Sequence, residues 1–304
     1  MSDKRNAYGG YFVWITFFTL AILKEPQAQF SSLQQRAADS MRLHYLNDQY
    51  IQSWIKSDTA TYNRLLWADE FVHLSAAKGK LLTKKELAPL FGAKRFDQID
   101  FFYADSVIVR LIADSVAFIY AVTPYREKGA SAVEYSRYND VYIKYPEGWK
   151  CVAANTVNIA LLNFRLPGIK ELHSFPQQKS SHTLVKTAAE ILQLNQQWVK
   201  AFAKNDQVFL AENGTEKSWI TYPDGSLEKG NLKAFRMLMI PTFKDSIVNE
   251  TVFFPRKDFA IVRNVLLLTV DHAKTMALQM CNYYLHHNGK WEMVSFNATA
   301  IRDE

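Results

Sequence analysis

Two stretches of the chain decide the fold, because they spell nearly the same pattern. The first, YIQSWIKSDTATYNRLLWADEFVHLSAAKGK, spans residues 50–80, and the second, QWVKAFAKNDQVFLAENGTEKSWITYPDG, spans residues 197–225. Each carries helical spacing of apolar residues that ends in a Lys-x-Asp step, at Asp58 and at Asp206. Aspartate is a favoured N-cap, so each step predicts that a second helix begins at once. A short strand and a glycine turn follow in both stretches, which indicates two copies of one unit.

The remainder of each copy is predicted to be strands. Four runs rich in β-branched and aromatic residues occupy 105–159 in copy one, and four more occupy 246–301 in copy two. The turns YPEGW and HHNGKW predict a hairpin between the last two strands of each copy. Beyond this turn the copies align without a gap, so that Trp149 matches Trp291, Val152 matches Val294 and Asn155 matches Asn297.

A third short helix is expected between the glycine turn and these strands. In copy one, Thr83 and Glu86 have the spacing of a capping box ahead of LAPLF. In copy two, LEKGNLKAF, which begins at Leu227, occupies the same place without that box. Both copies therefore have the predicted order helix, helix, strand, turn, helix and strands.

Composition limits the classes of function. The 304 residues are 48% hydrophobic and 22% charged, enough for two compact domains, and the net charge of +6 is spread along the chain. Acidic residues interrupt the basic runs, so we expect no nucleic-acid partner. Cys151 and Cys281 lie in apolar runs and are expected to be buried free thiols, although a bridge between the copies stays open. No zinc spacing, phosphate loop or Ser-His-Asp arrangement is visible, so we expect neither a metal nor a cofactor.

The N-terminus resembles an export signal. Lys4 and Arg5 precede the uncharged run YFVWITFFTLAIL at residues 11–23, which is short for a membrane span and typical of a secretory signal. We therefore expect residues 1–28 to be a signal peptide, cleaved after Ala28, with no stable membrane span after its removal. An uncleaved anchor is the alternative. Either reading predicts an exported protein, periplasmic or extracellular.

The pattern of both copies resembles a known superfamily. The segments SWIKSDTATYNRLLWADEFVHLSAAKGKLLTKKEL, residues 53–87, and SRYNDVYIKYPEGWKCVAANT, residues 136–156, are similar to NTF2-like domains of the SnoaL-like, DUF4440-type subgroup. The resemblance covers nearly all of both copies, although copy two lacks the Arg-Tyr pair of SRYND. We place NTF2-like domain 1 at residues 36–160, a linker at 161–182 and NTF2-like domain 2 at 183–304.

The resemblance implies an α+β fold of two tandem cone-shaped domains. Each is a curved antiparallel sheet wrapped around about three helices, with an apolar pocket between sheet and helices. Members include ketosteroid isomerase, scytalone dehydratase and polyketide cyclases, while others only bind ligands or partners. Such domains commonly dimerise through the outer faces of their sheets. Because VAFIYAV and NVLLLTV are apolar on both faces, we predict that the two copies form an intramolecular pseudo-dimer.

Candidate site residues follow from what these pockets would need. An isomerase of this kind uses a carboxylate base and acidic hydrogen-bond donors, for which copy one offers His73 and Asp140. In copy two Asn282 replaces Asp140, and Trp219 or Thr221 replaces His73. The candidates for lining a ligand pocket are Trp54, His73, Tyr103, Tyr120, Tyr138, Asn155, Trp198, Trp219, Tyr283 and Asn297. The alternative for each tyrosine is a core aromatic, and for His73 a strand histidine with its hydrogen bonds satisfied.

Alternation assigns some of these residues to common strand faces. Tyr138, Asp140 and Tyr142 are expected to share one face of their strand. Trp149, Cys151 and Asn155 are expected to share a face of the last strand. Which face looks into the pocket is not determined at this level.

Three functions stay open. The first is an exported tandem module that binds a small apolar or aromatic molecule, or an envelope partner, in a cone pocket. The second is an isomerase, dehydratase or cyclase that works through His73 or Asp140 of copy one. The third is a purely structural, partner-binding protein whose pockets are collapsed.

Overall fold

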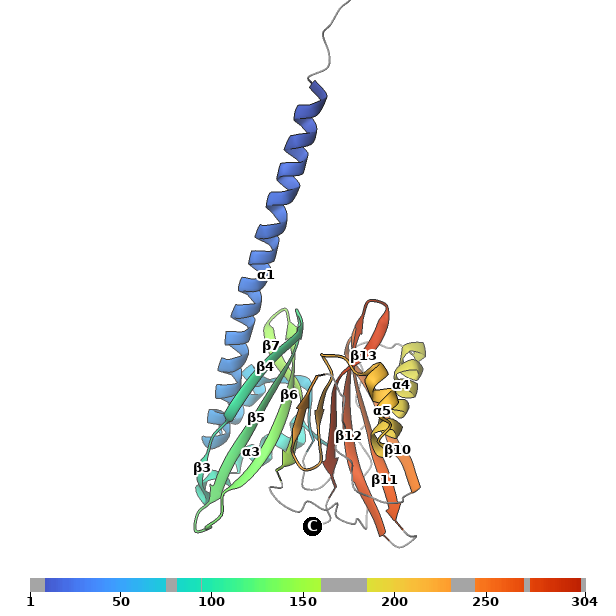
Figure 1. Ribbon diagram of the computed structural model, residues 1–304. Helices are drawn as coiled ribbons and strands as arrows, with labels where there is room; N and C mark the ends of the chain where they lie inside the picture. The colour runs from blue at the N-terminus through green and yellow to red at the C-terminus, as the bar shows by residue number, and fades with distance from the viewer. Residues whose placement is uncertain are drawn as a thin grey trace, which may run out of the picture.

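The chain forms two α+β halves, each a sheet with helices against one face (Figure 1). The structure is a computed structural model that describes residues 9–74, 81–93, 95–159, 185–230, 244–270 and 274–301. Residues 9–159 are called the first half below, and residues 185–301 the second half.

The first half begins with a long helix that continues into short helical turns. The helical elements are α1 (Gly9–Ile55), α2 (Thr59–Thr61), the π-helical turn η1 (Tyr62–Leu66), α3 (Lys84–Gly92) and the 3-10 turn η2 (Arg95–Gln98). The strands are β1 (Trp67–Leu74), β2 (Leu81–Thr83), β3 (Ile99–Phe102), β4 (Asp105–Ala113), β5 (Val116–Glu127), β6 (Glu134–Tyr145) and β7 (Gly148–Asn158).

The second half repeats this plan with fewer described helices. Its helices are α4 (Val185–Lys204) and α5 (Gln207–Asn213). Its strands are β8 (Trp219–Thr221), β9 (Leu227–Lys229), β10 (Lys244–Arg256), β11 (Phe259–Val270), β12 (Lys274–His287) and β13 (Lys290–Ala300). The helix predicted from Leu227 is wrong over Leu227–Lys229, because this segment pairs with β8 as strand β9. The rest of that predicted helix lies outside the described residues.

Side-chain caps start the short helices where the sequence predicts them. The Asp58 carboxylate accepts a hydrogen bond from the Thr61 amide at 3.1 Å, and that of Asp206 accepts one from the Phe209 amide at 3.0 Å. Both aspartates are therefore N-caps. Thr83 and Glu86 form the predicted capping box, since the Thr83 amide donates to Glu86 Oε2 at 2.8 Å and the Glu86 amide donates to Thr83 Oγ1 at 3.4 Å.

Both sheets have the same strand plan. The first has the order β2-β1-β7-β6-β5-β3, with β4 also paired to β5, and the second has the order β10-β11-β12-β13-β8-β9. Each predicted hairpin of last strands is present, and pairing is antiparallel apart from one pair per half. In that pair the first strand runs parallel to the last, β1 with β7 and β8 with β13. The sheets are therefore mixed rather than wholly antiparallel, because the last strand lies between its hairpin partner and the strand that follows the helices.

A β-bulge interrupts the last strand of each half at the same place. Val141 pairs with Ala153 but Tyr142 pairs with Cys151, which leaves Val152 as the extra residue. In the second half Tyr283 pairs with Ser295 and Tyr284 with Met293, which leaves Val294 as the extra residue. A bulge reverses the faces of the residues beyond it. The prediction that Asn155 shares a face with Trp149 and Cys151 is therefore wrong.

The two sheets pack face to face, which confirms the predicted pseudo-dimer. Their facing surfaces share one buried apolar cluster, here called the inter-sheet core, with Phe118 and Val141 from the first half and Ile261 and Tyr283 from the second. Tyr120 donates a hydrogen bond across it to Ser295 Oγ at 3.1 Å. Cys151 and Cys281 are buried free thiols, so no bridge joins the halves through them.

Arg110 of the first half forms a hydrogen bond and a cation–π contact with the second half. It reaches from β4 into the second half, where Nη1 donates to the Val294 carbonyl at 3.0 Å. Its guanidinium lies 4.6 Å from the centre of the Trp219 ring, and Lys229 lies 5.4 Å from the same ring. The Trp219 ring therefore makes cation–π contacts with one cation from each half.

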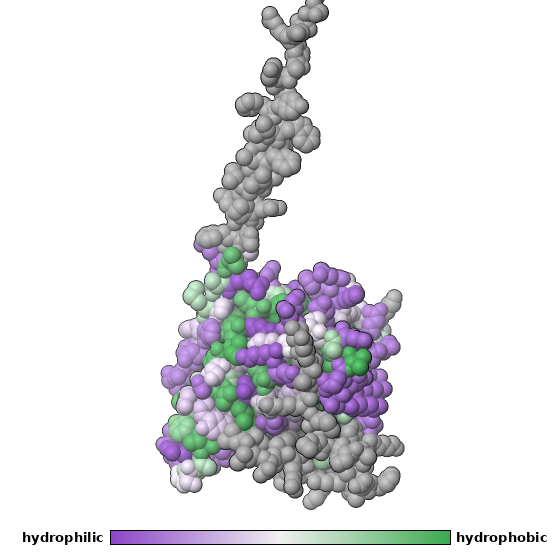
Figure 2. Space-filling model, in the orientation of Figure 1, coloured by the Kyte–Doolittle hydropathy of each residue, from purple (hydrophilic) through white to green (hydrophobic). Residues whose placement is uncertain are grey.

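At the surface, apolar residues alternate with polar ones (Figure 2). Among residues 32–55 of α1, the exposed large hydrophobic side chains are Leu33, Met41, Tyr45 and Ile55. None of the helices, as far as the structure describes them, has the length and apolarity that crossing a membrane requires. The predicted signal peptide, its cleavage and the predicted domain boundaries stay predictions.

Candidate functional site

The first half contains a cavity of about 210 Å³ between its helices and its sheet. Aromatic and aliphatic side chains line the helix side: Tyr50, Ile51 and Trp54 of α1, Phe91 of α3 and Phe102 of β3. Polar side chains dominate the sheet side: His73, Thr123, Ser136, Tyr138, Asp140, Ala154, Thr156 and Asn158. An apolar roof thus faces a polar floor, which suits a flat molecule with polar groups along one edge.

The roof is built from packed rings. Trp54 meets Phe102 edge to face at a centroid distance of 4.0 Å, and it lies 5.9 Å from Phe91. Tyr50 packs edge to face against Tyr62 at 4.9 Å, and Tyr62 donates a hydrogen bond to the Tyr50 carbonyl at 2.7 Å. These contacts fix the rings, so the cavity is formed before any ligand arrives.

Strand register places the two candidate catalytic residues in one row. Asp140 of β6 pairs with Ala154 of β7, which pairs with His73 of β1. Adjacent strands lie about 4.8 Å apart, so the Cα atoms of Asp140 and His73 are about 10 Å apart across the small side chain of Ala154. Both side chains line the cavity, and the space above Ala154 separates them.

Asp140 is a buried carboxylic acid. Its side chain is 3% exposed, and it makes no hydrogen bond within the part of the chain that the structure describes. Burial raises its pKa well above the ordinary value, because water no longer stabilises the carboxylate. Burial therefore favours the protonated form, which is able to donate a hydrogen bond into the cavity.

His73 is shifted in the opposite sense. Burial lowers its pKa to about 4, so the ring is neutral at pH 7. Its Nε2 lies 3.3 Å from Thr156 Oγ1, while Nδ1 is buried without a hydrogen-bond partner. A neutral imidazole and a carboxyl whose protonated form is favoured by burial thus face the same space.

Tyr138 is held by a polar residue of α1. Its hydroxyl donates to Asn47 Oδ1 at 2.7 Å, and Asn47 is 3% exposed. Burial raises the pKa of Tyr138. Because its proton is engaged by Asn47, the hydroxyl presents an acceptor rather than a donor to the cavity.

Several sequence candidates lie outside this cavity. Trp54, His73, Tyr138 and Asp140 line it, but Tyr103 is 52% exposed just after β3. Tyr120, Asn155, Trp219 and Tyr283 lie between the two sheets, and Asn297 donates to the Cys281 carbonyl at 2.9 Å on that same face. Their strand positions face the partner sheet, which an unknown register could not reveal.

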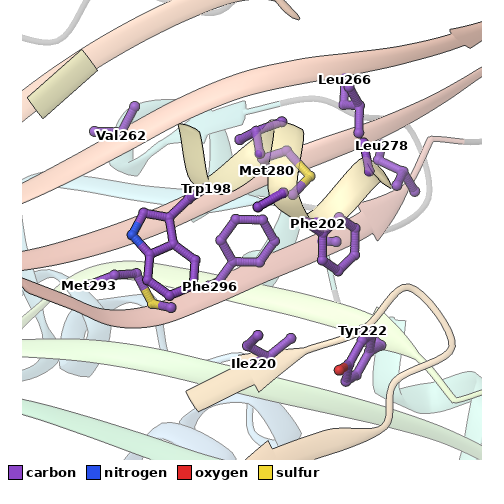
Figure 3. Close-up of a cluster of buried hydrophobic side chains, with 14 of the residues drawn as sticks. Trp198, Phe202, Ile220, Tyr222, Val262, Leu266, Leu278, Met280, Met293 and Phe296 are labelled. Atoms are coloured by element: carbon purple, nitrogen blue, oxygen red, sulfur yellow. The ribbon is translucent and has the colours of Figure 1, made fainter. Parts of the chain in front are cut away.

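The second cone is filled by side chains (Figure 3). Register matches Ala154 with Phe296 and Tyr138 with Met280, and both second-half residues are fully buried. Ile220 pairs with Phe296 as His73 pairs with Ala154, so the counterpart of His73 is Ile220 and not Trp219 or Thr221. Trp198, a pocket candidate from the sequence, packs in this filled core.

A hydrogen-bonded network replaces the acid in the second half. Asn282, the counterpart of Asp140, donates to Asn195 Oδ1 at 2.8 Å. Tyr284 donates to the same oxygen at 3.0 Å, and Asn195 Nδ2 donates to Asn264 Oδ1 at 3.0 Å. Counted back from the N-cap aspartates, Asn195 stands where α1 has Asn47. The same helix position thus binds a tyrosine beside an open cavity in one half and closes a polar network in the other.

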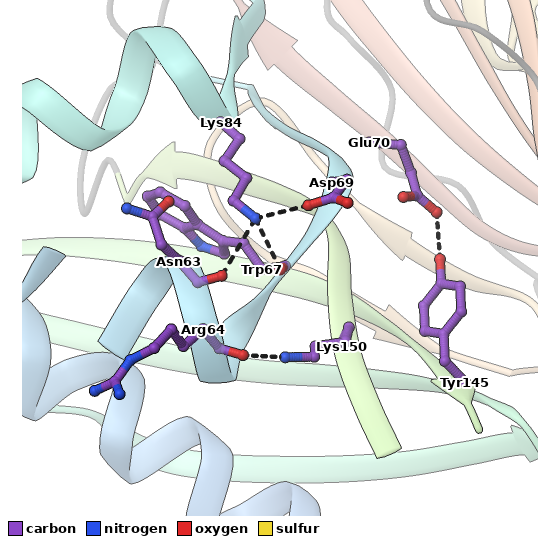
Figure 4. Close-up of polar contacts among 8 residues, drawn as sticks. All are labelled: Asn63, Arg64, Trp67, Asp69, Glu70, Lys84, Tyr145 and Lys150. Carbon is purple, nitrogen blue, oxygen red and sulfur yellow. Dashed lines mark hydrogen bonds and ion pairs between the residues drawn. The ribbon is translucent and has the colours of Figure 1, made fainter. Parts of the chain in front are cut away.

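A second, larger hollow of about 750 Å³ is a shallow groove beside α3. Lys84 occupies it, with Nζ donating to the carbonyls of Asn63 at 3.3 Å and Trp67 at 3.4 Å and to Asp69 at 3.1 Å (Figure 4). Lys150 donates to the Arg64 carbonyl nearby. These amines satisfy backbone carbonyls in and just after η1. The polar side chains of the groove therefore have a structural role, which does not require a ligand.

Some lining residues were not singled out from the sequence. Tyr50, Phe91, Phe102 and Thr156 line the cavity, and Ala154 leaves room for it. The gapless match of the last strands was the available signal, because it sets Ala154 against Phe296. Among the described residues, no group of three or more His, Cys, Asp or Glu side chains is placed to hold a metal ion.

Comparisons with known proteins match single halves of the chain. No family model matches it, and neither does any curated protein. An NTF2-like protein with a cystatin-like fold from Novosphingobium aromaticivorans is 12% identical, with 44% of this chain and 91% of that one covered at a TM-score of 0.39. An NTF2-like superfamily protein from Salmonella enterica is 14% identical, with 42% and 96% covered at a TM-score of 0.36. A protein of unknown function from Pectobacterium atrosepticum is 23% identical, with 40% and 90% covered at a TM-score of 0.32.

The topology itself settles the fold. Each half lays helices on one face of a mixed sheet, pairs its first strand with its last, and encloses its core between the two. This is the arrangement that the sequence resemblance implied. The chain is a tandem of two α+β halves with one strand plan, and the solved structures it is similar to include NTF2-like proteins.

Proposed function

We propose that the protein is an exported binding protein that takes a small, uncharged ring compound into the cavity of its first half. The observation that carries this proposal is the buried Asp140 carboxyl, without a hydrogen-bond partner among the described residues, facing a roof of aromatic rings. A buried carboxyl that stays neutral donates to a carbonyl, ether or phenol oxygen, and the loss of water in a buried cavity disfavours a bound anion. The run at residues 11–23 supports export.

The size of the cavity narrows the ligand. A void of about 150 Å³ lined by apolar groups holds a benzene ring. About 210 Å³ therefore suits one ring with one or two substituents. In this proposal a ring oxygen accepts the proton of Asp140, and the ring stacks among Trp54, Phe91 and Phe102.

Binding of matched neutral and charged rings tests this. We expect 4-hydroxybenzaldehyde to bind with a dissociation constant of roughly 10 µM to 1 mM in calorimetry, the range expected for so small a ligand. Benzoate should bind at least about tenfold more weakly, because its carboxylate would have to leave water for a buried cavity. Ala154→Phe should abolish binding by filling the space that Phe296 fills in the second half. Equal affinity for both rings, or unchanged binding in the variant, would count against the proposal.

A second candidate function, acid–base catalysis, is favoured by the opposite pKa shifts of Asp140 and His73. Environments that push two pKa values apart are typical of an acid and a base with separate roles. In this version His73 Nδ1 removes the proton from the α carbon of a cyclic β,γ-unsaturated ketone, Asp140 donates a hydrogen bond to the ketone oxygen, and His73 returns the proton to the γ carbon, which completes an isomerisation. The wild type should then convert such a ketone into its conjugated isomer, which is followed as a rise in ultraviolet absorbance. Asp140→Asn and His73→Gln should both lose this rise. A protein that binds such a ketone without converting it supports the binding function alone.

A further inference from the structure

Two hydrogen-bonded residues on opposite sheets lie directly behind the cavity floor. Asn155 of β7 donates from Nδ2 to the hydroxyl of Tyr283 of β12 at 2.7 Å, and to Asn139 Oδ1 of β6 at 2.8 Å. All three side chains are at most 2% exposed. A polar connection thus runs from the second half to two neighbouring strands of the first.

These two asparagines alternate with cavity residues along their strands. Asn155 lies between Ala154 and Thr156, and Asn139 lies between Tyr138 and Asp140. Successive residues of a strand point to opposite faces. The backbone that Asn139 and Asn155 hold on the outer face therefore also presents Asp140 and Ala154 to the cavity.

Tyr283 is itself fixed. Its ring meets Phe118 of the first half edge to face at 5.1 Å and stacks on Phe259 at 6.3 Å. The thiol of Cys281 donates to its hydroxyl at 3.2 Å. The hydroxyl is thus a rigid acceptor for Asn155.

The reverse connection is missing from the matching positions. Asn297, the counterpart of Asn155, donates to the Cys281 carbonyl at 2.9 Å and to Ser295 Oγ at 3.3 Å, both in its own sheet. Val141, the counterpart of Tyr283, has no polar group to offer it. At this matched pair, only the sheet with the open cavity receives a hydroxyl from its partner.

We infer that Tyr283 of the second half is a positioning residue for the cavity of the first half, setting through Asn155 and Asn139 where Asp140 stands. This inference rests on the proposed function, in which Asp140 contacts the ligand. It gives the second half a role despite its filled cone. Its sheet supplies a fixed backing for the cavity floor.

Tyr283→Phe in the full chain tests the inference, with Tyr284→Phe as the matched control. Both changes delete one buried hydroxyl from neighbouring residues, but Tyr284 donates to Asn195 inside the second cone. Two readouts are compared: the dissociation constant for 4-hydroxybenzaldehyde, and the infrared carbonyl band of protonated Asp140, assigned with Asp140→Asn. Asp39 should not contribute to this band. Burial acts to raise its pKa, but hydrogen bonds from Lys144 and Trp149 outweigh burial and leave it lowered.

We expect Tyr283→Phe to weaken probe binding about tenfold and to shift the Asp140 band, since a buried hydrogen bond is lost behind it. Tyr284→Phe should change neither by more than about twofold, although it loses a comparable hydrogen bond. Equal effects of the two variants on both readouts would overturn the inference. If the wild type does not bind the probe, the proposed function fails, and the infrared band still decides the positioning role. Should Tyr283→Phe not fold, Asn155→Ser removes the same bond from the other side.

Discussion

At the scale of single residues, the cavity contains an acid and a base whose uncharged forms are both favoured by burial. Burial raises the pKa of Asp140 and lowers that of His73. Folding therefore favours the protonated acid and the unprotonated imidazole. The two contributions to the free energy of unfolding change with pH in opposite directions. Each can be measured by replacing the residue that makes it with a side chain that does not titrate.

Asp140→Asn should stabilise the protein at pH 7. The folded pKa of Asp140 lies above its unfolded value of about 3.9, so its favourable contribution is complete below pH 3.9 and is lost as the pH rises toward the folded pKa. Over that window the free energy of unfolding of the wild type falls by at most about 1.4 kcal/mol per pH unit relative to the variant. Urea unfolding from pH 4 to pH 8 measures the difference. Asp114→Asn, at a side chain that is 98% exposed, is the control, and a difference independent of pH would contradict the expectation.

His73→Gln should flatten the acid side of the stability profile. The folded pKa of about 4 lies below the unfolded value of about 6.5, so protons bind the unfolded chain first and stability falls as the pH drops from 6.5 to 4. Between pH 6.5 and pH 5 this costs the wild type up to about 2 kcal/mol, an upper bound for a half-buried ring. Thermal unfolding at both pH values should show a smaller loss in the variant. The exposed His44→Gln should leave the loss unchanged.

Residue types alone pointed to Trp54, His73, Tyr138 and Asp140, which the cavity brings together. They could not separate these from Tyr120 or Tyr283, which carry the same aromatic and hydroxyl groups but face the partner sheet. The missing information is the inward face of each strand. The alternation of polar and apolar residues along each strand does not reveal it here, because both faces of these sheets are covered.

At the scale of elements, the helix caps and the hairpins could be predicted because their signals are local. Asp58, Asp206 and the Thr83–Glu86 box act where the sequence indicates. The Asn288–Gly289 turn also does, since both residues have positive φ, of 51° and 76°, as a tight hairpin turn requires. The bulges at Val152 and Val294 have no such signal, because an added residue in a strand changes no composition. Short strands such as β9 depend on pairing and were missed for the same reason.

At the matched positions Ala154 of β7 and Phe296 of β13, one substitution should fill the open cone and the other should leave a void in the filled cone. Phe296→Ala should destabilise the second half by about 3–5 kcal/mol, since it removes a fully buried ring and leaves a void. Ala154→Phe should change stability by less than about 3 kcal/mol, because its ring enters an existing cavity. Chemical unfolding of both variants gives the comparison. A larger loss for Ala154→Phe than for Phe296→Ala would mean that the first cone has no room.

At the scale of the whole molecule, the two halves share the inter-sheet core and should unfold together. Strands that are apolar on both faces predicted this packing, and the structure confirms it. The aromatic and aliphatic residues of that core leave water only when both halves are present. A single cooperative transition in calorimetry is therefore expected for the full chain.

Ile261→Asp should separate the halves. Ile261 is fully buried in the inter-sheet core, and an unpaired carboxylate there costs about 3 kcal/mol or more. We expect two transitions in calorimetry in place of one, the earlier being the half that loses more of its packing. Val208→Asp, at a residue that is 66% exposed on α5, should leave one transition. One unshifted transition for Ile261→Asp would show that the core is not shared.

The twin bulges bear on how the chain arose. A bulge at Val152 and at Val294 is the pattern that duplication of one unit already containing the bulge would leave. On that account the contrasts between Asp140 and Asn282, and between Ala154 and Phe296, are later than the duplication. The first half has a cavity and the second half is filled by side chains, so two copies of one unit differ in their interiors within a single polypeptide.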